Sequence, residues 1–113
     1  MRQTDRMTFS LDGWDLGRFE DIEWGPWGSG GNARAKMLAT GDDYYVALVE
    51  ADPGYQGDAH EHAYTEFLFV VDGTLRTQGR TMTTGDAYVA SAGSTHDDFG
   101  TDEGATYLSI FKL

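Results

Sequence analysis

The sequence predicts an all-β fold, and three of its features point that way. Its 113 residues include 15 glycines but only 2 prolines, and the glycines fall at short intervals. Between them lie short runs rich in aromatic and β-branched residues, which favour strands. No stretch shows the 3.6-residue apolar repeat of an amphipathic helix. Many short strands joined by tight glycine turns are typical of a closed barrel or a two-sheet sandwich.

The N-terminal segment, residues 1–32, is expected to be irregular. A Gly-Pro pair at 25–26 and a glycine-rich run at 28–32 would interrupt any regular element. Trp14, Trp24 and Trp27 should not all lie in water, so we expect this segment to pack on the barrel or on a partner subunit. Stacking of an aromatic substrate on Trp24 or Trp27 is the alternative.

Residues 33–113 are expected to form a single barrel, with turns at the positions that carry turn-forming residues. These turns are 40–43 (Thr-Gly-Asp-Asp), 52–54 (Asp-Pro-Gly), 72–73 (Asp-Gly), 79–80 (Gly-Arg) and 85–86 (Gly-Asp). A short corner is expected at 63–65. The strands between them are predicted at 33–39, 44–51, 56–62, 66–71, 74–78, 81–84, 87–90, 94–98 and 105–113.

The charge and the cysteine count exclude several classes of function. A formal net charge of -11 and a sequence pI near 4.3 disfavour binding to nucleic acid and to anionic membranes. The absence of cysteine removes disulfides, thiolate nucleophiles and cysteine-ligated zinc. The first seven residues are not followed by an apolar run, so we expect neither a signal peptide nor a membrane span. A chain without disulfides fits the cytoplasm, and we expect it there.

The stretch 67–71 (Phe-Leu-Phe-Val-Val) is apolar at every position. Because successive side chains of a strand point to opposite faces, such a strand is apolar on both sides and needs cover outside the barrel as well as inside. A subunit interface would supply that cover. We therefore expect a homodimer.

The three histidines of the chain and one glutamate form a pattern that suggests a metal site. His60 and His62 share one face of a predicted strand, and Glu66 begins the next strand. His96 follows on a distant strand and can close the set. Three imidazoles and a carboxylate can enclose a divalent cation, which would neutralise a buried carboxylate that is otherwise costly.

These residues stand in two motifs that resemble those of the cupin superfamily. Gly54-x5-His60-x-His62-x3-Glu66-x6-Gly73 matches the first cupin motif in full. Gly85-x5-Ser91-x-Gly93-x2-His96-x3-Gly100 resembles the second, with Ser91 where proline is usual and Gly100 where asparagine is usual. The resemblance implies a double-stranded β-helix, the jelly-roll barrel. It also implies four metal ligands, which are His60, His62, Glu66 and His96.

The ligand set suits several metals, and other residues could assist the chemistry. We expect one divalent transition metal per chain, with iron first and manganese, zinc, nickel or copper as alternatives. Asp58, Thr95 and Asp97 are candidates to orient the histidines. Tyr64, between two ligands, could donate a proton to a bound substrate, and Asp98 could act as a general base. The alternatives are a rim tyrosine and a surface aspartate.

A few further positions could line the site or contact a substrate. Arg34 and Lys36 share a strand face, and one of them pointing inward would select an anionic substrate. A solvated strand face is the alternative. Leu68 and Val70 have the parity of Glu66 and are expected beside the metal.

The sequence therefore predicts a small metal-binding barrel that handles a small molecule. The first hypothesis is a dioxygenase acting on a metal-chelating diketone, phenolic compound or organic acid. The second is a non-redox isomerase, lyase or polyketide-type cyclase that uses the metal as a Lewis acid. The third is a cupin that binds or senses a ligand without catalysis, because one fold hosts many functions.

Overall fold

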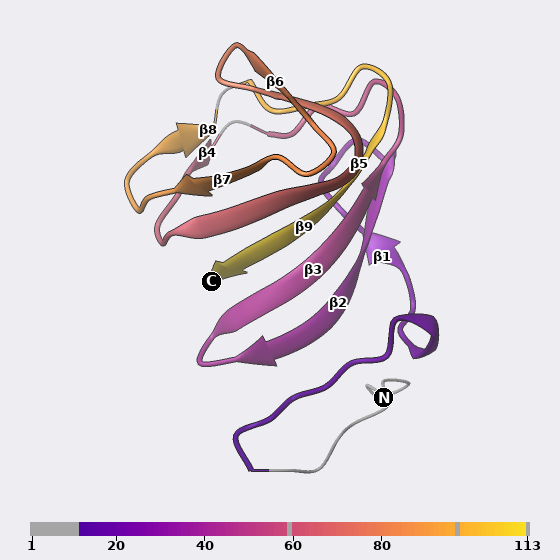
Figure 1. Cartoon of the computed structure of the whole chain (residues 1–113), viewed down its shortest axis with the longest axis vertical. Helices are drawn as coiled ribbons and strands as arrows, with labels where there is room; N and C mark the ends of the chain where they lie inside the picture. The colour runs from indigo at the N-terminus through magenta and orange to yellow at the C-terminus, as the bar shows by residue number, and fades with distance from the viewer. Residues whose placement is uncertain (1–11, 59, 97, 113) are drawn as a thin grey trace.

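A computed structural model describes residues 12–58, 60–96 and 98–112. These residues form strands almost throughout, with one 3-10 helix, and Figure 1 shows their arrangement. The elements are η1 (Phe19–Asp21), β1 (Gly25–Pro26), β2 (Ala33–Gly41), β3 (Tyr44–Ala51), β4 (His60–Glu61), β5 (Glu66–Thr77), β6 (Arg80–Thr83), β7 (Ala87–Ala90), β8 (Thr95–His96) and β9 (Ala105–Lys112).

The strands make one large antiparallel sheet and one small one. The large sheet has the order β1-β2-β3-β9-β5-β6, and β7 also pairs with β5. The small sheet pairs β4 with β8. In Figure 1 the large sheet curves from β2 to β5, and β4, β7 and β8 lie across its upper left. This arrangement is the predicted all-β jelly-roll barrel.

The core lies on the inner side of the curved sheet because strand residues alternate between its faces. On β3, for example, Ala47, Val49 and Ala51 are buried and the residues between them are partly exposed. The buried apolar residues are Ala33, Ala35, Ala47, Val49, Ala51, Tyr55, Leu68, Val70, Leu75, Met82, Phe99, Ala105 and Tyr107.

The prediction of a turn at residues 72–73 is wrong. β5 runs unbroken from Glu66 to Thr77, and its pairing with β9 shifts by one residue between Val70 and Asp72. Gly73 has a φ of 87° inside this strand, and a Cβ there would collide with the carbonyl oxygen of Gly104. The Asp-Gly pair therefore bends a long strand instead of ending it.

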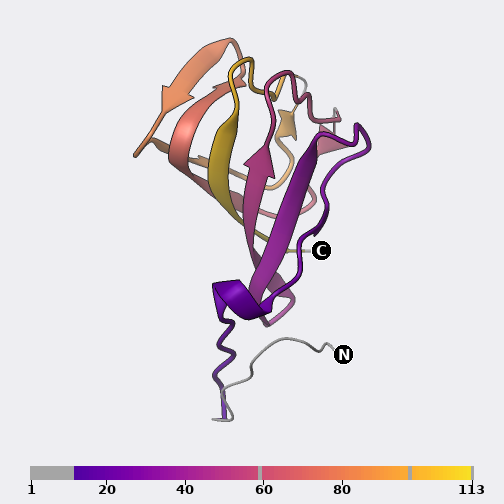
Figure 2. The ribbon, with the colours of Figure 1, turned by 90° about the vertical axis from the view of Figure 1, so that its right-hand side faces the viewer.

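Residues 12–32, the described part of the N-terminal segment, run along the β2 edge of the sheet (Figure 2). Lys36 of β2 is buried and donates a 2.6 Å hydrogen bond from Nζ to the carbonyl oxygen of Phe19. Its ammonium group also lies 3.8 Å from the centre of the Phe19 ring and 5.1 Å from that of Trp24. Lys36 thus holds the segment to the sheet and is not available to a substrate.

The three tryptophans have different surroundings. Trp27 packs against the core with an edge-on contact to Phe111, whereas Trp24 is half-exposed and Trp14 is 67% exposed. The packing of Trp27 agrees with the expectation that the three tryptophans would not all lie in water. No helix among the residues that the structure describes is long and apolar enough to cross a membrane.

Candidate metal centre

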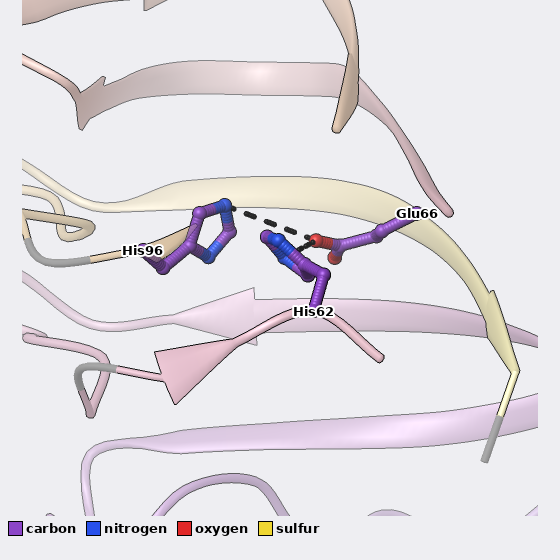
Figure 3. A group of neighbouring side chains, drawn as sticks. All are labelled: His62, Glu66 and His96. Atoms are coloured by element: carbon purple, nitrogen blue, oxygen red, sulfur yellow. Dashed lines mark hydrogen bonds and ion pairs between the residues drawn. The ribbon is translucent and has the colours of Figure 1, made fainter. Parts of the chain in front are cut away.

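Three of the predicted ligands meet inside the barrel. His62 follows β4, Glu66 begins β5 and His96 ends β8. Nε2 of His62 lies 2.9 Å from Oε1 of Glu66, and Nε2 of His96 lies 3.9 Å from the same oxygen (Figure 3). One ligand atom from each of the three lies within 4.8 Å of the others. The cluster is buried, with side-chain exposures of 6% for His62, 14% for Glu66 and 8% for His96.

The pairing of β4 with β8 brings His60 opposite His96 along the backbone. The side chain of His60 lies outside the described part of the structure, as do residues 59 and 97. Backbone hydrogen bonds between the same two segments fix His62. Its N–H donates to the carbonyl oxygen of Ser94, and its carbonyl oxygen accepts from the N–H of Gly93. Local backbone pairing thus sets the approach of the histidines.

The orientation of the His62 ring follows from the hydrogen bonds of Ser94. The Ser94 hydroxyl donates its one hydrogen to the carbonyl oxygen of Ser91 at 2.6 Å. It must therefore accept from Nδ1 of His62, which lies 3.0 Å away. This bond places the hydrogen of a neutral ring on Nδ1 and leaves the lone pair of Nε2 facing Glu66.

Glu66 is held at both of its oxygens. The hydroxyl of Ser109, a fully buried residue of β9, donates to Oε2 at 2.9 Å. The hydroxyl of Tyr88, on β7, donates to Oε1 at 3.4 Å and lies 3.0 Å from Nε2 of His96. Burial and the neighbouring carboxylate of Glu66 raise the pKa of Tyr88 well above its usual range, so its hydroxyl keeps its hydrogen.

This donor set fits a divalent metal ion. A lone pair of His62 and a carboxylate oxygen of Glu66 face each other at 2.9 Å, which is repulsive unless a proton or a cation lies between them. Nitrogen and oxygen ligands lie about 2.0–2.2 Å from such an ion, so two ligand atoms about 3 Å apart could share one. Imidazole and carboxylate together are ligands of iron, manganese, nickel, copper and zinc.

The ring of His96 is fixed by aromatic packing. It stacks on Phe99 with ring centres 5.0 Å apart and planes 6° from parallel, and it meets His62 edge-on at 4.3 Å. Phe99 in turn packs edge-on against Tyr107. The histidines are therefore positioned before any ligand arrives, which favours binding.

The cluster opens on a cavity of about 600 Å³. This volume is typical of sites for small organic molecules. Half of its lining residues carry aromatic rings, the two histidines included, and Tyr64 and Lys112 lie together at its edge, where the ammonium group is 5.3 Å from the Tyr64 ring centre. The lining residues are Trp27, Gly28, Tyr55, Gly57, Asp58, Glu61, His62, Ala63, Tyr64, Glu66, His96, Phe99, Tyr107, Ser109, Phe111 and Lys112.

The two candidate catalytic residues have different positions. Tyr64 lines the cavity and is 46% exposed, so it lies where it could reach a substrate. Asp98 is not among the cavity-lining residues, and its carboxylate accepts a 3.1 Å hydrogen bond from Arg76.

Leu68 and Val70, expected beside the metal, are core residues instead. Arg34 pairs with acidic side chains on the surface.

Several functional contacts were not predicted from the sequence. Ser94, Ser109 and Tyr88 form hydrogen bonds with the ligand residues of the cluster. Of the residues expected to orient the histidines, Asp58 lines the cavity and accepts a hydrogen bond from Ser29, and Asp97 lies outside the described residues. The sequence pattern could have pointed to Ser109, because it is a small polar residue on the face of the last strand that otherwise carries buried apolar residues.

One of the two departures from the second cupin motif has a structural explanation, and it is the glycine at position 100. Ser91 begins a tight turn that closes with a 3.0 Å hydrogen bond from the N–H of Ser94, and Gly93 takes the positive φ within it. Gly100 bridges two chain segments, and a Cβ there would lie 2.6 Å from the carbonyl oxygen of Tyr55. The close backbone approach explains glycine where asparagine is usual.

Comparisons with known structures show the same fold. An acetylacetone dioxygenase from Acinetobacter johnsonii is 16% identical with a TM-score of 0.73, covering 94% of this chain and 80% of that one. An RmlC-like cupin from Shewanella frigidimarina is 21% identical with a TM-score of 0.75, covering 94% of each chain. A chain from the complex of Rhodobacter sphaeroides SigE with the anti-sigma ChrR is 24% identical with a TM-score of 0.69, covering 84% of this chain and 52% of that one.

No curated protein matches the sequence. A family profile does, and it describes the ChrR cupin-like domain and matches residues 14–112. This match covers nearly the whole chain, and it agrees with the two motifs and with the barrel. The chain therefore belongs to the ChrR cupin-like domain family of the cupin superfamily.

Proposed function

We propose that the protein is a metal-dependent enzyme that acts on a small organic molecule. The observation that carries the proposal is a buried cluster of His62, Glu66 and His96 at the wall of a cavity of about 600 Å³. Buried ionisable groups that converge on a cavity are typical of active sites. We propose His60 as the fourth ligand on the strength of the motif, since its backbone lies opposite His96.

The first reaction that we propose is oxygenation of a chelating diketone, phenolic compound or organic acid by an iron form of the protein. A bound iron ion would supply Lewis acidity and the redox chemistry that dioxygen requires. An acetylacetone dioxygenase among the similar structures supports this choice. A non-redox isomerase, lyase or cyclase would use the same ligands with zinc, nickel or manganese.

The protein's own residues would position the reactants and exclude water. Ser109 and Tyr88 hold the two oxygens of Glu66, and Ser94 fixes the ring of His62. The aromatic wall offers flat apolar surfaces to an unsaturated substrate and keeps bulk water from the cluster. Tyr64, at the edge of the cavity, is the residue that we propose to donate a proton or a hydrogen bond to the substrate.

Ligand or metal sensing without catalysis is the second candidate. It is supported by the family itself, which is described by the ChrR cupin-like domain, and by the similarity to a chain in the complex of SigE with the anti-sigma ChrR. The same buried ligand cluster would then serve as a receptor site. We further propose a cytoplasmic location, in keeping with a sequence that has no cysteine.

Oxygen consumption by defined metal forms separates these functions. The protein is stripped of metal, loaded with iron(II) or with zinc, and mixed with a panel of diketones and catechols in an oxygen-electrode cell. We expect uptake that depends on both substrate and iron and that is lost in Glu66→Ala. Substrate binding without uptake in the iron form would reject the dioxygenase and leave the non-redox enzyme or the sensor, which product analysis distinguishes.

A further inference from the structure

One basic side chain borders the cavity. Lys112 ends β9, and it is the only lysine or arginine among the described residues that line the cavity. The lining also includes three acidic side chains, Asp58, Glu61 and Glu66. The chain as a whole has 19 acidic residues and only 8 lysines and arginines. Lys112 therefore supplies the ammonium charge that a ligand in this cavity would meet.

The other basic residues of the described chain have different positions. Arg34 and Arg76 each form ion pairs with two acidic side chains. Lys36 is buried, and its ammonium group donates to a backbone carbonyl oxygen of the N-terminal segment. Arg18 and Arg80 are exposed and do not line the cavity. The two basic residues of β2 that were expected to select an anion are therefore both occupied elsewhere.

The ammonium group of Lys112 is held by aromatic rings. Its Nζ lies 5.4 Å from the centre of the Tyr44 ring and 5.3 Å from that of the Tyr64 ring. A cation within about 6 Å of such a ring centre is attracted to the face of the ring. Lys112 forms no ion pair with an acidic side chain among the residues that the structure describes. The two rings thus position the charge without neutralising it.

Lys112 lies closer to solvent than the proposed metal ligands do. Ser109, Phe111 and Lys112 of β9 all line the cavity. Ser109 is fully buried and donates to Glu66, whereas Phe111 and Lys112 are partly exposed. Tyr64, beside the ammonium group, is 46% exposed. Along β9 the cavity wall therefore changes from a buried metal-ligand cluster to a half-exposed cation at the end of the strand.

This position suits an anionic group of a ligand. A carboxylate that is buried completely loses its hydration, and that loss is costly even when the carboxylate is paired. A carboxylate beside the half-exposed Lys112 keeps part of its hydration and gains a counter-charge. Elsewhere an anion is repelled by the acidic lining residues and by a protein of net charge -11. An anionic ligand would therefore place its charge beside Lys112.

We propose that Lys112 selects a ligand with two functional ends, a metal-chelating group such as a β-diketone and a carboxylate. The chelating end meets the cluster of His62, Glu66 and His96. The carboxylate pairs with Lys112 at the edge of the cavity, and the part between them lies along the aromatic wall. Among the substrate classes proposed above, Lys112 favours a keto acid over a neutral diketone. This inference rests on the proposed function, because it needs a ligand held at the metal cluster.

A diketone acid and its methyl ester test the inference, because they share the chelating group and differ in charge. We would titrate 4,6-dioxoheptanoate and its methyl ester into the zinc-loaded protein and measure both dissociation constants by calorimetry. An exposed ion pair contributes up to about 5-fold to affinity, and a hydrogen bond to a charged group more than about 10-fold. For a half-exposed pair we expect the acid to bind about 5- to 20-fold more tightly than the ester.

Substitutions at position 112 separate the effect of the charge from the effect of the side chain's bulk. Lys112→Met removes the ammonium group and keeps an unbranched side chain, so the advantage of the acid over the ester should disappear. Lys112→Arg keeps the charge and should keep most of the advantage. Arg80→Met is the matched control, because it removes the same charge from a position outside the cavity and should leave the advantage unchanged. Zinc content and circular dichroism check that each variant is loaded and folded.

Two further measurements strengthen the test. The acid and ester that are one methylene group longer, 5,7-dioxooctanoate and its methyl ester, show whether the carboxylate of the shorter acid simply fails to reach Lys112. Raising the salt concentration should reduce the advantage of the acid, because ions screen a half-exposed pair.

The outcomes separate this inference from the proposed function. If neither acid binds more tightly than its ester, or if Lys112→Met leaves the advantage unchanged, the inference alone is overturned. An unchanged advantage would mean that the carboxylate binds the metal or another part of the protein. If all four compounds bind no more tightly with zinc than without it, the proposed function is overturned as well.

Discussion

Removing one hydroxyl group that holds the glutamate ligand should weaken metal binding measurably. Ser109 is fully buried, and its hydroxyl donates to Oε2 of Glu66 at 2.9 Å. A hydrogen bond to a charged group contributes about 1.5–3 kcal/mol. Residues that orient metal ligands typically contribute 10- to 100-fold to metal affinity. We therefore expect Ser109→Ala to raise the zinc dissociation constant about 10- to 100-fold.

The assay is a competition for zinc between the protein and a chromogenic chelator of known affinity. Thr106→Ala, on the outer side of the same strand, removes a hydroxyl without touching the cluster and should change the zinc affinity less than about 2-fold. Circular dichroism of the metal-free proteins shows whether both variants fold. A folded Ser109→Ala protein with zinc affinity within about 2-fold of the wild type would refute the claim that Ser109 positions Glu66 for metal.

Three further substitutions test other parts of the structure. Tyr88→Phe removes the second donor to the carboxylate ligand, so we expect about 10-fold weaker zinc binding by the same competition assay. Gly100→Asn, which restores the residue usual in the motif, should lower the free energy of unfolding by about 1–3 kcal/mol in urea titrations, because its Cβ meets backbone at 2.6 Å. Gly41→Ala is its control, with nothing within 4 Å of the new Cβ. Lys36→Met removes the ammonium group that holds the N-terminal segment, so trypsin should cut that segment several-fold faster than in Arg80→Met. Equal cutting rates would contradict this role.

The sequence was most informative where function depends on spacing. His62 ends one predicted strand, and Glu66 begins the next strand after a short corner. This interval predicts that both side chains face the barrel interior. The pairing of β4 with β8 brings His96 to the same place, and the second motif anticipated it. The hairpin of residues 33–51 was also predicted well, since its turn carries residues that adopt positive φ, Asp42 and Asp43.

Cross-strand contacts were harder to predict because they depend on register. Ser109 reaches Glu66 from a strand 43 residues away, and no local pattern gives that alignment. The turn expected at residues 72–73 failed for a related reason. Pairing with β9 on both sides of Val71 outweighs the local preference of Asp-Gly for a turn, and the pair becomes a bend within β5.

Lys36 shows how tertiary contacts reverse a surface prediction. Its position on β2 suggested either a solvated side chain or one that selects an anion. The structure instead buries it beneath Phe19 and Trp24, in a segment whose irregular sequence gives no sign of this contact. The ammonium group obtains a carbonyl acceptor and two aromatic faces there, which offset the cost of leaving water.

The most direct test of a metal centre is the metal content of the protein itself. Protein purified without an affinity tag is analysed by plasma mass spectrometry, beside Glu66→Ala and the control Thr81→Glu, at an exposed position of β6. We expect close to one transition-metal atom per chain in the wild type and in the control, and a folded Glu66→Ala protein that holds almost none. A wild type that stays empty after incubation with iron, zinc and manganese, or a Glu66→Ala protein that is fully loaded, would contradict the assignment of the cluster as a metal site.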